Sequence, residues 1–304
     1  MNNNAIAIID YGSQYTQLIA RRVRELNIYS IILPYDFKES HVDFSSIKGI
    51  ILSGGPSSVY DKSSPKLNKA ILTHNIPILG VCYGLQLLIE NFSGIVKNGN
   101  IGEYGPSEIF LKEKSKLFTS VSSKTNVWMS HGDKIEDMPN DWIVTSKSEN
   151  NVISSVESKS LNIYGVQFHP EVVHTQEGTK IIKNFVLGIC QIIPDWNSEN
   201  FIKNTISEIR NTVKDSKVLC ALSGGVDSTV VSTIMKKAIG DNAICVFIDH
   251  GLLRKNEAQE VVDMFNESLD LDINLYDRSE VYKDIKLHWY VAVCVKSNAL
   301  KVTG

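Results

Sequence analysis

The chain has 304 residues, of which 43% are hydrophobic and 21% are charged, a composition typical of a globular protein with a sizeable core. Its formal net charge of −3 at pH 7 argues against a nucleic-acid partner and against an anionic membrane surface, because both favour a basic excess. The length predicts one large domain or two ordinary ones.

The N-terminus and the cysteines predict a cytoplasmic protein. Residues 1–4 carry no basic segment and lead into no long apolar core, so we expect no secretory signal. The longest apolar stretch, 76–89, is too short to cross a bilayer. The five cysteines form no regular framework and no C-x-x-C pair, so we expect reduced thiols.

Short apolar runs alternate with helical patterns in the first part of the chain. The runs are continuously apolar, which is typical of strands that are covered on both faces. Their alternation with helices predicts βαβ units and a parallel sheet. We expect strands at 5–10, 29–33, 49–52 and 76–81, and a helix at 15–26.

The pattern changes between about 108 and 160. Shorter alternating segments, such as 142–146 and 152–156, predict antiparallel strands there. A buried strand at 163–168 and a helix at 178–190 then complete the first unit.

Residues 193–198 have the composition of a linker, and a second α/β unit follows. Its predicted elements are a helix at 201–213, strands at 218–222, 243–249 and 273–276, and helices that end at 239 and 269. The sequence therefore predicts two units, at 1–195 and 196–304.

The first candidate site centres on Cys82, which lies between Gly80 and Gly84 at the end of an apolar run. A structural cysteine needs no flanking glycines, whereas a nucleophile on a tight strand–helix turn does. The start of the following helix also favours the thiolate.

His169 and Glu171 lie two residues apart at the end of another predicted strand. If the strand geometry persists, both side chains point to one face. The histidine can then reach the sulfur while the carboxylate orients the ring. Gly54 and Gly55 follow a third strand and leave backbone N–H groups open to a ligand. Each feature alone is more often structural, but together they favour a catalytic thiol.

The second candidate site is the loop SGGVDS at 223–228, between a strand and a helix. Glycines and serines at a helix N-terminus can form an anion-binding nest. The loop lacks the G-x-x-x-x-G-K-[ST] pattern, so it is no Walker A loop. It suits a pyrophosphate held by amides and hydroxyls, and the alternative is a plain turn.

Other reactive side chains have weaker settings. His131 lies in Ser130-His131-Gly132-Asp133, where an ordinary turn is an equal alternative. We expect the remaining cysteines to be packing residues: Cys190, Cys220, Cys245 and Cys294.

These motifs resemble two known families. GVCYGLQ at 80–86 and HPE at 169–171 resemble class I (triad) glutamine amidotransferases. SGGVDS, with FIDHGLLRKNE at 247–257, resembles the N-type ATP pyrophosphatases. Their order, together with DYGSQYTQLIARRVRE at 10–25, resembles the glutamine-hydrolysing GMP synthetase family from about residue 5 to about 282.

The resemblance implies an α/β fold. A class I amidotransferase domain at 1–195, with a mixed, largely parallel sheet and helices on both faces, would precede part of a Rossmann-like ATP pyrophosphatase domain at 196–304.

The resemblance also implies roles for individual residues. Cys82 would be the nucleophile, His169 the base and Glu171 its orienter, with the backbone amides of Gly55 and Tyr83 as oxyanion donors. The glutamine pocket would comprise Gln86, Ser130, Gly132 and Asp133. ATP, with Mg²⁺, would be held by Ser223, Gly224, Gly225, Val226, Asp227, Ser228 and Thr229.

The implied reaction joins two steps. Glutamine hydrolysis yields glutamate and ammonia, and ATP adenylates xanthosine 5′-phosphate (XMP) so that ammonia displaces AMP and GMP forms. Family members are homodimers and extend well beyond 304 residues, with a C-terminal domain that forms the dimer and much of the XMP site. Because 284–304 no longer resembles the family, we expect a truncated chain with glutaminase activity at most. The alternatives are an amidotransferase subunit for another acceptor and a non-catalytic remnant.

Overall fold

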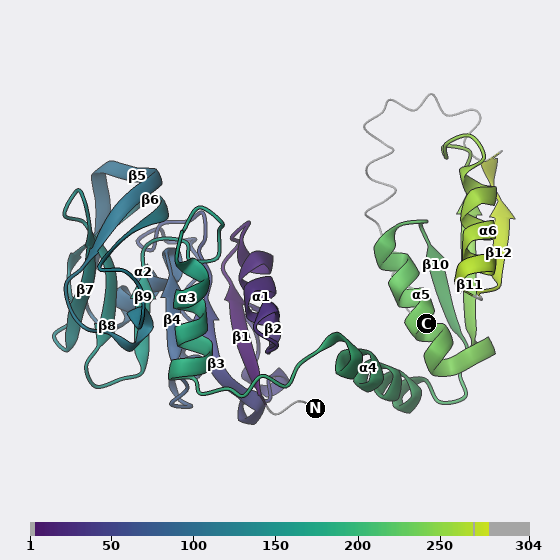
Figure 1. Ribbon diagram of the computed structural model, residues 1–304, viewed down its shortest axis with the longest axis horizontal. Helices are drawn as coiled ribbons and strands as arrows, with labels where there is room; N and C mark the ends of the chain where they lie inside the picture. The colour runs from purple at the N-terminus through teal and green to yellow at the C-terminus, as the bar shows by residue number, and fades with distance from the viewer. Residues whose placement is uncertain (1–3, 270, 280–304) are drawn as a thin grey trace. The chain divides into compact units, whose positions relative to one another are not determined.

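The computed structural model describes residues 4–269 and 271–279, which form two compact units (Figure 1). The first unit ends at Asn197 and the second begins at Ser198. Within the described ranges, no helix is both long enough and apolar enough to cross a membrane.

The first unit is built on a nine-stranded mixed sheet with the order β2-β1-β3-β4-β9-β8-β7-β5-β6. Its parallel strands are β1 (Ala5–Asp10), β2 (Tyr29–Pro34), β3 (Ile47–Leu52), β4 (Ile78–Val81) and β9 (Ile163–Val166). The antiparallel strands are β5 (Ile95–Leu111), β6 (Lys124–Asp137), β7 (Trp142–Ser148) and β8 (Ile153–Ser158).

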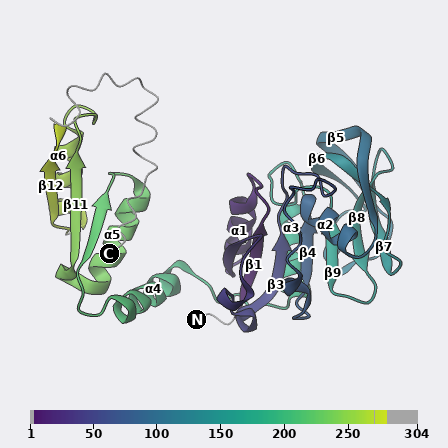
Figure 2. The same cartoon turned by 180° about the vertical axis from the view of Figure 1, so that it is seen from behind.

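Helices cover both faces of the parallel part (Figures 1 and 2). On one face, α1 (Thr16–Glu25) and α3 (Gly178–Lys183) pack on a core that includes Ile6, Ile8 and Val81. On the other, α2 (Tyr83–Asn91) packs on a core that includes Ile9 and Leu52. Burial on both faces explains the continuously apolar runs, and the expected fold class is confirmed. Short 3₁₀ turns lie at Glu39–His41, Phe44–Ser46, Lys69–Leu72 and Lys116–Phe118.

Two features of this unit differ from the sequence prediction. The antiparallel region begins at Ile95 rather than near 108, because β5 contains Asn, Gly and Pro residues and a register shift between Asn98 and Glu103 that hide the alternation. The predicted helix at 178–190 is α-helical only to Lys183. It continues as a π-helix over Asn184–Ile189, where the N–H of Cys190 bonds to the carbonyl of Phe185.

The second unit has a three-stranded parallel sheet in the order β10-β11-β12. Its core is small and contains Cys220, Cys245 and Phe265. Helix α5 ends at Gly240, whose φ of 57° suits a glycine. The expected elements are confirmed: α4 (Ser198–Val213), β10 (Val218–Leu222), α5 (Val226–Ile239), β11 (Ala243–Asp249), α6 (Glu257–Leu269) and β12 (Ile273–Asp277). A 3₁₀ turn (Gly240–Asn242) follows α5. The segment 284–304 and Cys294 lie outside the described residues.

Candidate active site

Cys82 occupies the strand–turn–helix junction predicted for it. It caps the N-terminus of α2 directly after β4, with φ 51° and ψ −107°. This backbone conformation is costly for a residue other than glycine, and the bond from the Cys82 N–H to the carbonyl of Val166 (2.8 Å) holds it. A Cβ on Gly84 would lie 2.5 Å from the carbonyl oxygen of Leu52, and one on Gly80 would lie 2.6 Å from the nitrogen of Leu85. The flanking glycines therefore let α2 start directly against the sheet.

The sulfur of Cys82 lies among polar groups although the residue is only 5% exposed. The thiol donates to the carbonyl of Ser130 at 3.6 Å, and the amide Nε2 of Gln167 donates to the sulfur, also at 3.6 Å. These contacts orient the thiol toward the backbone of β6 and toward Gln167, one residue beyond the end of β9.

His169 and Glu171 meet as predicted, but not through strand geometry. Strand β9 ends at Val166, so His169 lies in the turn beyond it. The His169 N–H donates to the carbonyl of Trp128 (3.0 Å), and the hydroxyl of Thr175 donates to the His169 carbonyl (2.6 Å). These bonds aim the imidazole so that its Nδ1 lies 2.7 Å from Oε1 of Glu171, whose side chain is fully buried.

The electrostatics favour a charged imidazole. Burial lowers the pKa of His169, but hydrogen bonding with Cys82 and Glu171, and their charges, outweigh it and raise the pKa to about 10. Glu171 has one partnered oxygen, since its Oε2 is buried without a hydrogen bond among the described residues. A proton on Nδ1 of His169 is therefore the group that offsets this buried carboxylate.

Gly54 lies beside the thiol and the imidazole, and Gly55 lies against Tyr11 and Tyr83. A Cβ on Gly54 would lie 3.0 Å from Cε1 of His169 and 3.7 Å from Cβ of Cys82. A Cβ on Gly55 would lie 2.7 Å from the backbone oxygen of Tyr11 and 3.3 Å from the Tyr83 ring. Only glycine brings the backbone this close, and the Tyr83 amide belongs to the first turn of α2, whose N–H groups have no intrahelical partner.

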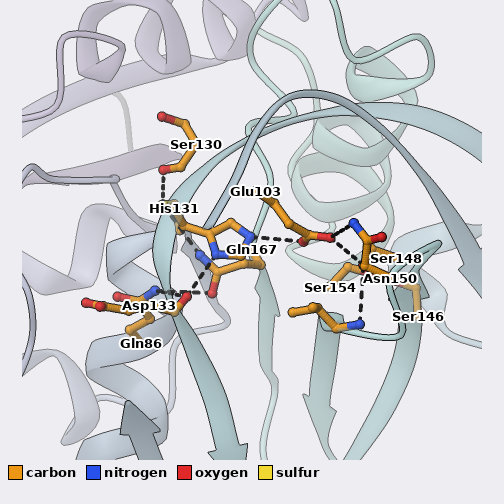
Figure 3. Close-up of polar contacts among 12 residues, drawn as sticks. Gln86, Glu103, Ser130, His131, Asp133, Ser146, Ser148, Asn150, Ser154 and Gln167 are labelled. Carbon is orange, nitrogen blue, oxygen red and sulfur yellow. Dashed lines mark hydrogen bonds and ion pairs between the residues drawn. The ribbon is translucent and has the colours of Figure 1, made fainter. Parts of the chain in front are cut away.

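Of the four residues expected to bind glutamine, Ser130 contacts the sulfur and Gln86 is linked to it through Gln167. Figure 3 shows these two and Asp133 with their partners. The amide of Gln86 donates to Oε1 of Gln167 (3.3 Å) and contacts the carbonyl of Asp133 (3.5 Å). Tyr60 donates its hydroxyl to Oδ1 of Asp133 (2.8 Å). Gly132 has the Tyr104 hydroxyl 3.2 Å from where its Cβ would lie.

Sequence reasoning missed several residues of this cluster. Gln167 touches both the sulfur and Gln86, and its signal was a polar side chain within the apolar run 163–168. Glu103 gave no signal, because its partners come from other strands. His131, left undecided between a turn and a site, is buried at 7% exposure.

The other described cysteines have no such setting. Burial raises the pKa of Cys190, Cys220 and Cys245, which favours the neutral thiol. All the described cysteines are free thiols.

The second candidate site, the loop 223–228, joins β10 to the start of α5. Gly224 has a φ of 71°. The hydroxyl of Ser228 donates to the carbonyl of Gly225 (3.0 Å) and lies 3.2 Å from that of Ser223. Thr229 also donates to Gly225 (2.9 Å). The loop therefore presents hydroxyls and the first amides of α5 at one exposed point.

The fold and the cluster around Cys82 define an α/β protein with a cysteine, a histidine and a glutamate aligned at the end of a sheet. Residues 7–189 match the model for glutamine amidotransferase class-I, and residues 197–287 match the PP-loop domain. The chain belongs to the class-I glutamine amidotransferase family.

Relatives carry both units in the same order. The chain is 46% identical over 277 residues to the GMP synthase [glutamine-hydrolyzing] of Carboxydothermus hydrogenoformans, covering 91% of this chain and 54% of that protein. It is 45% identical over 278 residues to the protein of the same name from Bacillus anthracis, with the same coverage. The chain thus spans about half the length of these curated relatives.

A solved structure resembles the first unit. A Thermoplasma acidophilum protein, named as one subunit of GMP synthase, is 30% identical, with a TM-score of 0.54, and the match covers 66% of this chain and 97% of that one. The likeness to class I amidotransferases predicted from the motifs is confirmed.

Proposed function

We propose that the chain hydrolyses glutamine to glutamate and ammonia through a thioester on Cys82. The observation that carries this proposal is the grouping of the three side chains: a strained thiol on the elbow, the imidazole of His169 beside the same Gly54 as the thiol, and the buried Glu171 at 2.7 Å from Nδ1. Class I amidotransferase membership supports it independently.

Each group has a step in this proposal. The thiolate of Cys82 attacks the carboxamide carbon, and the amides of Gly55 and Tyr83 stabilise the oxyanion that forms. The imidazolium of His169 gives its proton to the departing ammonia. Neutral His169 then takes a proton from water as the water opens the thioester, while Glu171 keeps the ring oriented.

The glutamine is recognised by the cluster beside the sulfur. We assign this role to Gln86, Ser130, Gly132 and Asp133, as the resemblance implies, and we add Gln167. The amide of Gln167 lies 3.6 Å from the sulfur, so its N–H group can donate a hydrogen bond that stabilises the thiolate.

The second unit is proposed to bind ATP. The nest at 223–229 suits the pyrophosphate part, because exposed hydroxyls and helix amides accept an anion without a lysine. Mg²⁺ fits the exposed Asp227 together with phosphate oxygens, since this ion is usually held by one or two carboxylates plus substrate phosphates. Among the described residues, no group of three or more histidine, cysteine or acidic side chains forms a metal site by itself.

The complete reaction proposed for the family is amination of XMP to GMP, driven by ATP adenylation of XMP. The relatives named GMP synthase support this assignment. We propose the 304 residues as the part that supplies ammonia and holds the pyrophosphate, in a reducing, cytosolic setting and in a homodimeric enzyme.

A second candidate is an amidotransferase subunit that delivers ammonia to a separate synthetase chain. It is favoured by the Thermoplasma acidophilum protein, which the match covers almost entirely. The two candidates share the chemistry at Cys82 and differ in where the acceptor is bound.

The test supplies the purified chain with glutamine alone and then with glutamine, ATP, magnesium and XMP, and measures glutamate and GMP separately. Glutamate in both mixtures supports glutamine hydrolysis. GMP in the second mixture assigns the acceptor site to this chain, whereas GMP only after addition of a separate synthetase chain supports the second candidate. No glutamate under any condition refutes the proposal.

A further inference from the structure

Two buried titratable side chains lie behind the proposed glutamine pocket without a step in its chemistry. Glu103 on β5 and His131 on β6 are directly paired across the hairpin. Their side chains are 6% and 4% exposed, and Nε2 of His131 lies 3.3 Å from Oε2 of Glu103 (Figure 3).

The hydrogen bonds around His131 fix its tautomer. Nδ1 lies 2.8 Å from the backbone oxygen of Asp133, and a carbonyl only accepts, so Nδ1 carries a proton. In the neutral ring, Nε2 then presents a lone pair to Glu103.

The carboxyl group of Glu103 is equally constrained. Its Oε1 accepts from the hydroxyl of Ser148 (2.7 Å) and from the amide of Asn150 (2.9 Å). Oε2 is left to face Nε2 of His131, and neither atom has a hydrogen bond to another described residue. Two lone pairs that face each other in a buried site repel, and one proton between them removes the repulsion.

This pair is attached to the part of the chain that lines the sulfur. His131 follows Ser130, whose carbonyl accepts from Cys82, and it binds the carbonyl of Asp133, which Gln86 also contacts. The segment 130–133 is therefore tied at both ends to the pocket and in its middle to Glu103.

We propose that Glu103 and His131 share one proton and act as positioning residues, holding segment 130–133 where it recognises the amino-acid head of glutamine. The inference rests on the proposed glutamine hydrolysis and extends it to two residues that no assigned role covers. Ser148 and Asn150 hold the carboxyl group, so the loop that follows β7 also supports the pocket.

Opposing influences act on the proton of His131. Burial lowers the pKa of His131 and the charge of His169 lowers it too, while the Asp133 carbonyl and Glu103 raise it, with a net lowering. The charged groups that act on His131 are Glu103 on β5 and His169 beyond β9. Without the shared proton, the site would hold a buried negative charge and two facing acceptors, which would release segment 130–133.

The test compares two reagents that alkylate Cys82 in the full chain. A diazoketone analogue of glutamine carries the amino-acid head, and iodoacetamide does not, so the ratio of their rate constants measures recognition apart from thiol reactivity. We expect Glu103→Ala to lower this ratio about 5- to 150-fold, since an orphaned buried partner costs on the order of 1–3 kcal/mol, with the iodoacetamide rate unchanged. The matched control is Glu108→Ala on the same strand, which removes a surface ion pair with Lys124 (2.8 Å).

Glu103→Gln keeps the test decisive if the alanine variant does not fold. Its amide can donate to Nε2 of His131 while its oxygen accepts from Ser148 and Asn150, and it cannot lose the proton. We expect this variant to keep the wild-type ratio, because its amide replaces the shared proton.

Three outcomes overturn the inference. One is an unchanged ratio in folded Glu103→Ala, and another is a Glu103→Gln variant as poor as the alanine variant. The third is an unmoved ¹⁵N signal of His131 Nε2 in Glu103→Ala, since we expect that signal to move toward the position of an unprotonated nitrogen.

The spectra also separate this inference from the proposed function. If wild-type protein shows no preference for the glutamine analogue, the proposed function fails, and the ¹⁵N signal of His131 still tests the pair by itself.

Discussion

Replacing Glu171 by glutamine tests how the protein keeps His169 charged. The carboxylate is fully buried and lies 2.7 Å from Nδ1, and the side chain that replaces it still accepts that hydrogen bond but carries no charge. A hydrogen bond to a charged group contributes about 1.5–3 kcal/mol, and a shift of one pKa unit corresponds to about 1.36 kcal/mol. The pKa of His169 should therefore fall by about 1–2 units in the variant.

The raised pKa of His169 determines the pH range in which the variant should lose activity. The wild-type pKa of about 10 keeps the imidazolium, which protonates the leaving ammonia, until the pH rises through that value. The assay is the pH profile of kcat/KM for glutamate release between neutral pH and pH 10. Its alkaline limb should move from about pH 10 to about pH 8–9, and turnover should fall about 10- to 150-fold.

Glu177→Gln is the matched control, since that carboxylate pairs with the exposed Lys180 (2.6 Å) and accepts from the Ser122 N–H (2.8 Å), and neither partner belongs to the proposed triad. An unmoved alkaline limb in folded Glu171→Gln would show that the carboxylate does not set the pKa of His169.

Three further changes test the rest of the account. His169→Ala should reduce turnover more than Glu171→Gln does, because the imidazole moves the proton and the carboxylate only orients it; the reverse ranking in folded variants contradicts the assigned roles. Gly84→Ala should lower the free energy of unfolding, measured by urea denaturation, by about 1–3 kcal/mol, because its Cβ would lie 2.5 Å from the Leu52 oxygen. Gly188→Ala is the control and should not lower it, because the space around that position is open. Ser228→Ala should weaken binding of Mg²⁺–ATP about fivefold by calorimetry, for one lost hydrogen bond of about 1 kcal/mol, with the exposed Ser207→Ala on α4 as control; equal affinities would remove the loop from the ATP site.

Most of the fold was predictable because its strands carry strong local signals. The run 5–10 forms β1 and 218–222 forms β10, since both are continuously apolar and bounded by turn residues. The hairpin of β5 and β6 was not predictable in full. Its pairing spans a bulge between Asn98 and Glu103, and Pro106 lies inside β5 opposite Trp128, so contacts between strands override the local propensity.

The candidate site also combines residues that were predictable from the sequence with residues that were not. The elbow at Cys82 was visible in its two glycines, and His169 and Glu171 were visible as a pair at a strand end. The residues behind the pocket were not, because Glu103 on β5 meets Ser148 on β7 and Asn150 in the following loop only in the folded sheet. Sequence spacing carries no information on such contacts.

The central claim is a thioester between glutamine and Cys82, and trapping it is the most direct test. The purified chain is incubated with radiolabelled glutamine, quenched in acid and digested, and the label is mapped by mass spectrometry. We expect label on the peptide that contains Cys82 in the wild-type protein and none in Cys82→Ala, which should stay folded and release no glutamate. Glutamate release by Cys82→Ala at the wild-type rate, or label on a different residue, would contradict the account.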